Sequence, residues 1–188
     1  MPDYIRWFSQ VRNADTALVG GKNASLGEMY SQLAAQAVRV PNGFAVSAQA
    51  YRDALARAHA EPKLRALLDD FDKTDVKRLA KLARAARQIV YDATDMPELR
   101  EQICRAYGEL VRQYGSELAV AVRSSATAED LPTASFAGQH ESYLHIQGER
   151  DLFEACRRCF ASIFTDRAII YRIDNGLIIS RSRCPWAS

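Results

Sequence analysis

Hydrophobic positions recur with two different periods along this chain, and the helical period dominates its middle. Across residues 62–114 apolar side chains return every three or four positions, which is typical of amphipathic helices. Two such stripes are Val76, Leu79, Ala83, Ala86 and Val90, followed by Leu99, Ile103, Tyr107, Leu110 and Tyr114. Pro97 stands where the second helix would begin, a position that suits proline. Because no polar side chains converge in this block, we interpret it as a packed helical layer.

Short strands are predicted on both sides of the helical block. Strands are expected near residues 5–8, at 118–122 and at 141–146. Residues 40–46 are expected to form a turn that leads into another brief strand. The last segment alternates apolar and polar residues, so one of its faces should be buried.

Further helices complete the pattern. Residues 19–29 predict a glycine turn that leads into a helix extending to about residue 35, with Asn23 as its N-cap. Ser47 is expected to cap another helix, and two more should cover 152–164 and 166–173. Helices mixed with short strands predict an α+β fold.

Composition and charge argue against a nucleic-acid-binding, membrane or secreted protein. The chain has 188 residues, of which 48% are hydrophobic, enough to build a core. The net charge is only +2, so charge does not favour a nucleic-acid or membrane partner. No apolar run approaches the roughly 20 residues of a membrane span, and the N-terminus lacks the plan of a secretion signal. We expect a cytoplasmic protein.

Cysteine and histidine residues give no catalytic or metal site. Cys156 and Cys159 form a C-x-x-C pair, which raises zinc or redox chemistry as an alternative. Their surroundings repeat at helical spacing and no second close pair completes four ligands, so we favour reduced core cysteines. His140 and His145 should point to opposite faces of a strand, and His59 has no visible partner. We assign no catalytic residue and no metal ligand.

The segment 121–139 carries the most informative chemistry. A β-branched apolar run ends at Arg123, and small hydroxylated residues then lead to Gly138. A strand end would fix the stem of the arginine, while the Gly138 backbone and the Ser142 hydroxyl could contact phosphate oxygens. The alternatives are an ion pair of Arg123 with an acidic residue at 129 or 130, and a simple turn at Gly138.

Lys22 is the second candidate cation. It follows two glycines at the start of a predicted helix, where bare backbone and unpaired N–H groups favour anions. The pattern is not a P-loop, since the first glycine is missing and Asn23 follows the lysine. Taken alone, Lys22 is better explained as an ordinary exposed lysine.

Four ordered segments resemble one enzyme family. They are residues 19–29, 40–47, 121–139 and 160–172. In this order they are similar to the phosphoenolpyruvate-utilising enzymes, which include phosphoenolpyruvate synthase, pyruvate phosphate dikinase and rifampicin phosphotransferase. The resemblance covers about residues 4–176, and the Ser-Ser-Ala-Thr-Ala-Glu-Asp-Leu-Pro wording is closer to the synthase and the rifampicin enzyme.

The resemblance implies a fold and a set of site residues. Residues 1–176 would form the N-terminal part of an ATP-grasp domain, with the helical block of about 62–114 inserted. Lys22 and Arg123 would contact ATP phosphates. Three residues would belong to the loop that covers those phosphates, namely Gly138, Gln139 and Ser142.

The resemblance also implies an activity. The chain would be the ATP-binding portion of a phosphoenolpyruvate synthase, a phosphotransferase that converts ATP, pyruvate and water to phosphoenolpyruvate, AMP and phosphate. One alternative is the equivalent portion of a rifampicin phosphotransferase. Another is a non-catalytic module in which the helical block binds a partner protein.

Residues 177–188 depart from the family pattern. The family continues there into a second ATP-grasp lobe that carries the Mg²⁺ carboxylates, and none of these has a counterpart in this chain. We therefore expect weak ATP binding and no turnover by this polypeptide alone. A separately made C-terminal portion is a candidate partner, and a frameshift or a natural short tail would explain the ending.

Overall fold

The computed structural model describes residues 2–34, 38, 40–68, 76–125, 130–131, 134–135 and 141–174. Helices and short antiparallel strands alternate along them, which confirms the expected α+β class. The helices are α1 (Thr16–Val19), α2 (Gly21–Ala34), α3 (Ala48–Arg57), α4 (Ala60–Leu68), α5 (Val76–Ala93), α6 (Pro97–Tyr114), α7 (Glu149–Ala161) and α8 (Asp166–Asp174). Single 3-10 turns are η1 (Phe8–Gln10), η2 (Asn13–Asp15) and η3 (Ser162–Phe164).

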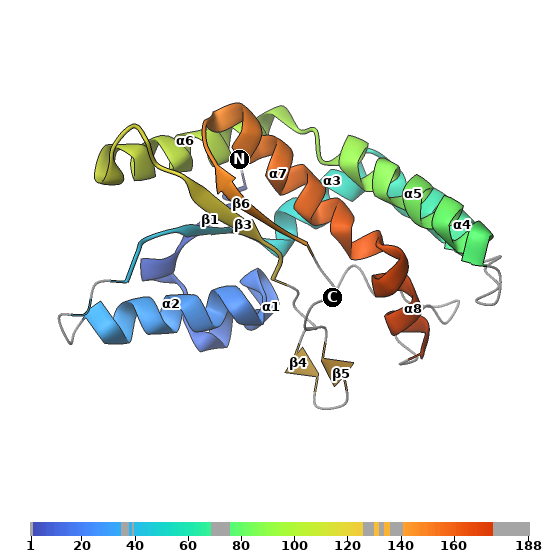
Figure 1. Ribbon diagram of the computed structural model, residues 1–188, viewed down its shortest axis with the longest axis horizontal. Coiled ribbons are helices and arrows are strands. Elements are labelled where there is room, and N and C mark those ends of the chain that lie inside the picture. The colour runs from blue at the N-terminus through green and yellow to red at the C-terminus, as the bar shows by residue number, and fades with distance from the viewer. Residues whose placement is uncertain are drawn as a thin grey trace.

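The described strands form three antiparallel pairs. The strands are β1 (Ile5–Trp7), β2 (Phe44–Val46), β3 (Val120–Arg123), β4 (Asp130–Leu131), β5 (Ala134–Ser135) and β6 (Ser142–Ile146). Strand β1 pairs with β2, β3 pairs with β6, and β4 pairs with β5. In Figure 1, α1 and α2 lie on one side of the β1–β2 pair, and α6 and α7 lie on the other.

Three apolar clusters hold these layers together. One joins α3, α4 and α5 to α8 and the end of α7, and its fully buried members include Leu64, Val90 and Phe164. The second packs β1, α3, α6 and α7 around Leu99 and Phe153. The third lies between β2 and the α1–α2 segment. The predicted stripes of the helical block therefore do face a core, although Tyr114 at the end of the second stripe is 44% exposed.

Strand β2 separates the second cluster from the third. Ala45 is buried against Val11, Val19 and Ala24 on the α2 side. Its neighbours in the strand, Phe44 and Val46, pack on the opposite side, as the two-residue period of a strand requires.

Arg157 joins α7 to α5. Its guanidinium lies 3.8 Å from the centre of the Tyr91 ring, and its Nη2 donates to the Tyr91 carbonyl oxygen at 2.9 Å. The Tyr91 hydroxyl in turn donates to Glu154 at 2.5 Å. This hydrogen bond is the main reason that the pKa of Glu154 lies below its ordinary value. The sequence pattern did not predict this network.

The predicted strand alternation at residues 141–146 is only partly correct. Val120 is opposite Ile146 and Val122 is opposite Tyr143, so β6 contains one more residue than β3 over this span. The extra residue makes a bulge, and His145 adopts φ +55° there. Leu144 is consequently 64% exposed, instead of alternating into the core.

Of two predicted helix caps, the one at Asn23 is wrong and the one at Ser47 is confirmed in position. Asn23 lies inside α2, which already begins at Gly21, and its side-chain Nδ2 donates to the Val19 carbonyl oxygen at 2.8 Å. Ser47 does stand at the N-cap of α3, but its buried hydroxyl makes no hydrogen bond among the described residues. Tertiary packing displaces the local side-chain bonding expected from sequence.

The C-x-x-C cysteines lie in α7 with free thiols. Cys156 is buried and Cys159 is half-buried. Burial is the main cause that raises the pKa of each thiol to about 12. This is the core location that the helical spacing predicted. None of the described helices is both long and apolar enough to cross a bilayer.

Gly27 is expected to tolerate no side chain. A Cβ there would lie 2.5 Å from the Val11 carbonyl oxygen and 2.7 Å from the Val11 Cβ, whereas one at Gly108 in α6 would meet nothing within 4 Å. Gly27→Ala should lower the free energy of unfolding by about 1–3 kcal/mol through overpacking. Gly108→Ala should raise it by about 0.5–1 kcal/mol because alanine favours the helix. Urea denaturation measures both, and equal effects of one sign would contradict the packing described.

The two thiols of α7 should resist alkylation while the chain is folded. With a pKa near 12, the thiolate fraction of Cys156 at pH 8 is lower by roughly three orders of magnitude than in the unfolded chain. We expect iodoacetamide to leave Cys156 and Cys159 largely unmodified in buffer and to modify both in urea, as measured by peptide mass spectrometry. Equal labelling rates in the two conditions would show that α7 does not bury them.

Candidate functional site

The junction between α1 and α2 lies against the end of β3. Gly20 connects the two helices with φ +81° and ψ 160°, a conformation that favours glycine. A Cβ at this position would lie 2.3 Å from Ser125 Oγ and 2.4 Å from the Ser125 carbonyl oxygen. Absence of a side chain at Gly20 therefore allows the backbone of the loop after β3 to touch the start of α2.

A hydrogen bond holds the same contact. The Asn23 backbone N–H donates to Ser125 Oγ at 3.1 Å, across 102 positions of sequence. The first N–H groups of a helix have no acceptor within the helix, and here the Ser125 hydroxyl oxygen accepts a hydrogen bond from one of them. The start of α2 and the end of β3 are thus joined by both packing and hydrogen bonding.

Arg123 and Ser142 are neighbours at one end of the β3–β6 pair. Arg123 is the last residue of β3 and lies directly opposite Ser142, the first residue of β6. Both residues are exposed. The prediction that a strand end positions Arg123 is correct, and its side chain and the Ser142 hydroxyl start from adjacent backbone positions.

Lys22 lies in the first turn of α2, one residue before Asn23. Backbone dimensions along the path through Asn23 and Ser125 limit the Lys22–Arg123 Cα separation to about 15 Å. The positive charge of Lys22 partly lowers the pKa of Cys159, while Glu141 raises it. Lys22 and Glu141 therefore influence the Cys159 thiol with opposite signs, both less than burial does.

Glu141 is already engaged with a neighbour on its own strand. The Tyr143 hydroxyl donates a hydrogen bond to the Glu141 carboxylate. Burial first, and this hydrogen bond second, raise the pKa of Tyr143 above its ordinary value. The half-buried Tyr143 side chain therefore stays a neutral donor to Glu141 at physiological pH.

Some predicted site residues lie outside the described part of the chain. Gly138 and Gln139 are among them, so their approach to Lys22 stays a prediction. The same holds for the alternative ion pair of Arg123, because the side chains of Glu129 and Asp130 are not described. The structure pairs Arg123 with Ser142, and it places the start of α2, which carries Lys22, against Ser125 two residues after Arg123.

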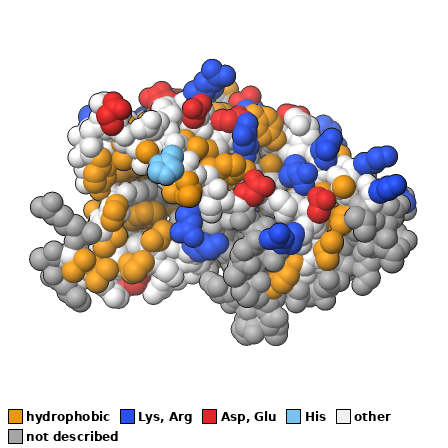
Figure 2. Space-filling model, viewed as in Figure 1, with side chains coloured by type: hydrophobic (Ala, Val, Ile, Leu, Met, Phe, Trp, Pro, Cys, Tyr) orange, Lys and Arg blue, Asp and Glu red, His pale blue; other side chains and the backbone are white. Residues whose placement is uncertain are grey.

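Basic side chains are visible on the face that contains this junction. Figure 2 shows Lys and Arg side chains grouped where α1 and the end of β3 meet in Figure 1, beside atoms that are not described. Hydrophobic side chains cover much of the neighbouring α2 surface in the same view. An anionic ligand would meet local positive charge here although the net charge of the chain is only +2.

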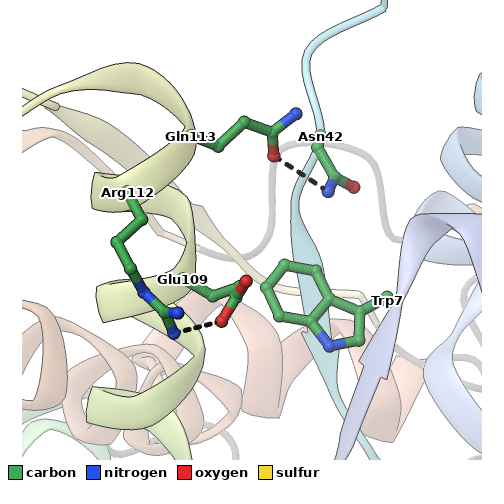
Figure 3. A pocket seen from close by; sticks show the side chains of 5 residues that line it. All are labelled: Trp7, Asn42, Glu109, Arg112 and Gln113. Atoms are coloured by element: carbon green, nitrogen blue, oxygen red, sulfur yellow. Dashed lines mark hydrogen bonds and ion pairs between the residues drawn. The ribbon is translucent and has the colours of Figure 1, made fainter.

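A separate pocket lies between β1 and α6, away from this junction. Its volume is about 350 Å³, and its lining residues are Trp7, Asn42, Glu109, Arg112 and Gln113. Figure 3 shows Arg112 paired with Glu109 and Asn42 bonded to Gln113, at 3.3 Å between Nδ2 and Oε1. Because these polar groups bond to one another, the pocket offers a ligand few side chains whose charges or hydrogen-bonding groups are not already used.

Metal ligation has no support within the described segments. They contain no group of three His, Cys, Asp or Glu side chains arranged to hold an ion. No described residue is therefore assigned to Mg²⁺.

Ser125 is the residue that sequence reasoning missed. It was part of the hydroxylated segment, but nothing in the local pattern distinguished it from Ser124. The only available signal was the hydroxyl two positions after Arg123. Its partners, Gly20 and Asn23, lie about a hundred positions earlier, so the pairing emerges only in the folded chain.

Comparisons with known proteins agree on one family. The model of the pyruvate phosphate dikinase AMP/ATP-binding domain matches residues 16–182. Phosphoenolpyruvate synthase of Synechocystis sp. is 49% identical over 177 residues, which are 92% of this chain and 22% of that protein. The Pseudomonas aeruginosa synthase is 48% identical over 94% of this chain, and the Escherichia coli synthase 45% over 92%, with 22% of each relative covered.

The chain spans about a fifth of the length of these curated relatives, and the family match spans most of the chain. The matched range contains Lys22, Arg123 and Ser142. The chain therefore belongs to the pyruvate phosphate dikinase AMP/ATP-binding domain family.

Proposed function

We propose that this chain is the ATP-binding portion of a phosphoenolpyruvate synthase. The observation that carries the proposal is the junction at which α2 meets β3, because it brings Lys22 and Arg123 to one region of a domain whose family is named for AMP/ATP binding. Relatives named phosphoenolpyruvate synthase, at 43–49% identity, supply the reaction class.

Each residue has a distinct role in this proposal. Arg123 offers a planar fork that can hold two phosphate oxygens, and Lys22 offers a flexible point charge. The Ser142 hydroxyl adds a neutral donor beside Arg123. Gly138 and Gln139 would cover the phosphates from the intervening loop. Phosphoryl transfer depends mainly on positioning and charge neutralisation, which is the chemistry that such a set provides.

The remainder of the active site is proposed to lie in the part of the enzyme that this chain does not span. We propose that residues 1–176 form the first lobe of an ATP-grasp domain. A second lobe would then supply the Mg²⁺ carboxylates and close on the nucleotide. A separately made C-terminal portion would be the partner of this chain. The low coverage of the relatives, about 22% of the Synechocystis protein, supports this division.

Removing either cation should weaken ATP binding without unfolding the chain. Loss of a hydrogen bond to a charged group costs about 1.5–3 kcal/mol, so we expect Arg123→Ala to raise the Kd for ATP by roughly 10- to 100-fold. Lys22→Ala should raise it by about tenfold. Isothermal titration calorimetry of the purified chain measures both, with circular dichroism as the check on folding.

Lys63→Ala is the matched control. Lys63 is an exposed lysine of α4, at the opposite end of the molecule from α2 in Figure 1. Its removal takes away the same charge but should leave the Kd unchanged. Equal affinity of the wild type, Lys22→Ala and Arg123→Ala would refute the proposed site.

A further inference from the structure

We propose that the contact between Gly20 and Ser125 sets the spacing of Lys22 and Arg123, and that Ser125 is a positioning residue for phosphate binding. The inference rests on the proposed function, in which both cations hold the same nucleotide. It adds a role for two residues that neither carry charge nor need to touch the ligand.

The first support is steric. Gly20 and Ser125 are so close that a Cβ on Gly20 would overlap three atoms of Ser125, two of them backbone atoms at 2.4 and 2.5 Å. A side chain could rotate away from such a clash, but the Ser125 backbone could not. Ordinary contact could be restored only by moving the end of β3, on the order of 1 Å, away from the start of α2.

The second support is the hydrogen bond on the opposite side of the same contact. Asn23 N–H donates to Ser125 Oγ at 3.1 Å, and Asn23 follows Lys22 directly. The missing side chain at Gly20 therefore allows the two segments to approach this closely, and the hydrogen bond to the Ser125 hydroxyl holds them at that separation. Lys22 lies between these two attachment points, and Arg123 lies two residues before Ser125.

The functional consequence follows from the geometry that phosphate binding needs. Two cations hold one polyanion well only if their separation matches the ligand, and misplacement by about 1 Å can cost up to a hundredfold where alignment is critical. A shift of β3 relative to α2 changes that separation directly. The contact also takes part in the packing of the fold, because the flanking residues Val19 and Ala24 are buried in the third cluster, so each binding measurement needs a check on folding.

Gly20→Ala and Gly148→Ala form a matched pair for the test. Gly148, before α7, has φ +82° and ψ 153°, nearly the conformation of Gly20, but a Cβ there would meet nothing within 4 Å. Both variants carry the same backbone strain, and only Gly20→Ala disturbs Ser125. We expect the Kd for ATP to rise about tenfold or more in Gly20→Ala and to stay unchanged in Gly148→Ala. Overpacking should also lower the urea midpoint of Gly20→Ala below that of Gly148→Ala, so the two are compared under conditions in which circular dichroism shows both folded.

Ser125→Ala tests the other side of the contact without adding an atom. It should raise the Kd for ATP by about three- to tenfold in the wild-type background. In the Lys22→Ala background the same substitution should have little further effect, because residues that act together are not additive. Ser116→Ala, at an exposed serine after α6, controls for loss of a hydroxyl.

Each outcome distinguishes the two proposals. If Lys22→Ala and Arg123→Ala bind ATP like the wild type, or the wild type binds none, the proposed function fails and this inference with it. If those variants weaken binding but Gly20→Ala matches Gly148→Ala, the positioning role is overturned and the proposed function stands. Fully additive effects of Ser125→Ala and Lys22→Ala would also overturn the positioning role.

Discussion

The close approach of the α1–α2 junction to the end of β3 is the constraint on which the candidate site depends. Neither segment alone provides two cations for a phosphate group. The start of α2 carries Lys22, and the end of β3 carries Arg123. The contact at Gly20 and Ser125 and the Asn23 hydrogen bond bring them together. In the proposed site, a glycine and a hydroxyl would position the two charges that hold the phosphates.

The helical layers supply the rigidity that the strands lack. A two-stranded sheet is marginally stable in water, so the β3–β6 pair needs packing from outside. Helix α7 contacts both strands, and the cluster around Leu99 and Phe153 includes partly buried residues from both. Arg157 in turn ties α7 to α5. The helical block thus has a role in the site although it contributes no predicted ligand-binding residue.

Electrostatics in this region depends on partial burial. Lys22 is half-buried and influences the thiol of Cys159, which is itself largely withdrawn from water. A cation in such surroundings is less screened than one on an open surface, so its attraction for phosphate is stronger. Helix α7 buries the C-x-x-C thiols and also contacts both strands of the β3–β6 pair.

The sequence by itself determined the α+β class, the helical block, the strand ending at Arg123 and the family of the chain. These features rest on local periodicity and on ordered motifs, both of which are visible along the chain. It also placed Pro97 at the start of α6, because proline is suited to that position whatever the surroundings. The covering role of Gly138 and Gln139 stays a prediction.

Only the tertiary structure decided how Asn23, Ser47, Leu144 and Ser125 are used. Asn23 donates to Val19 instead of capping α2, and the Ser47 hydroxyl is buried without a hydrogen bond among the described residues. A bulge in β6 exposes Leu144 where strict alternation would bury it. Ser125 acquires its partners across 102 positions. The physical reason is common to all four: each outcome depends on which distant backbone lies alongside, and periodicity within one segment carries no information about that.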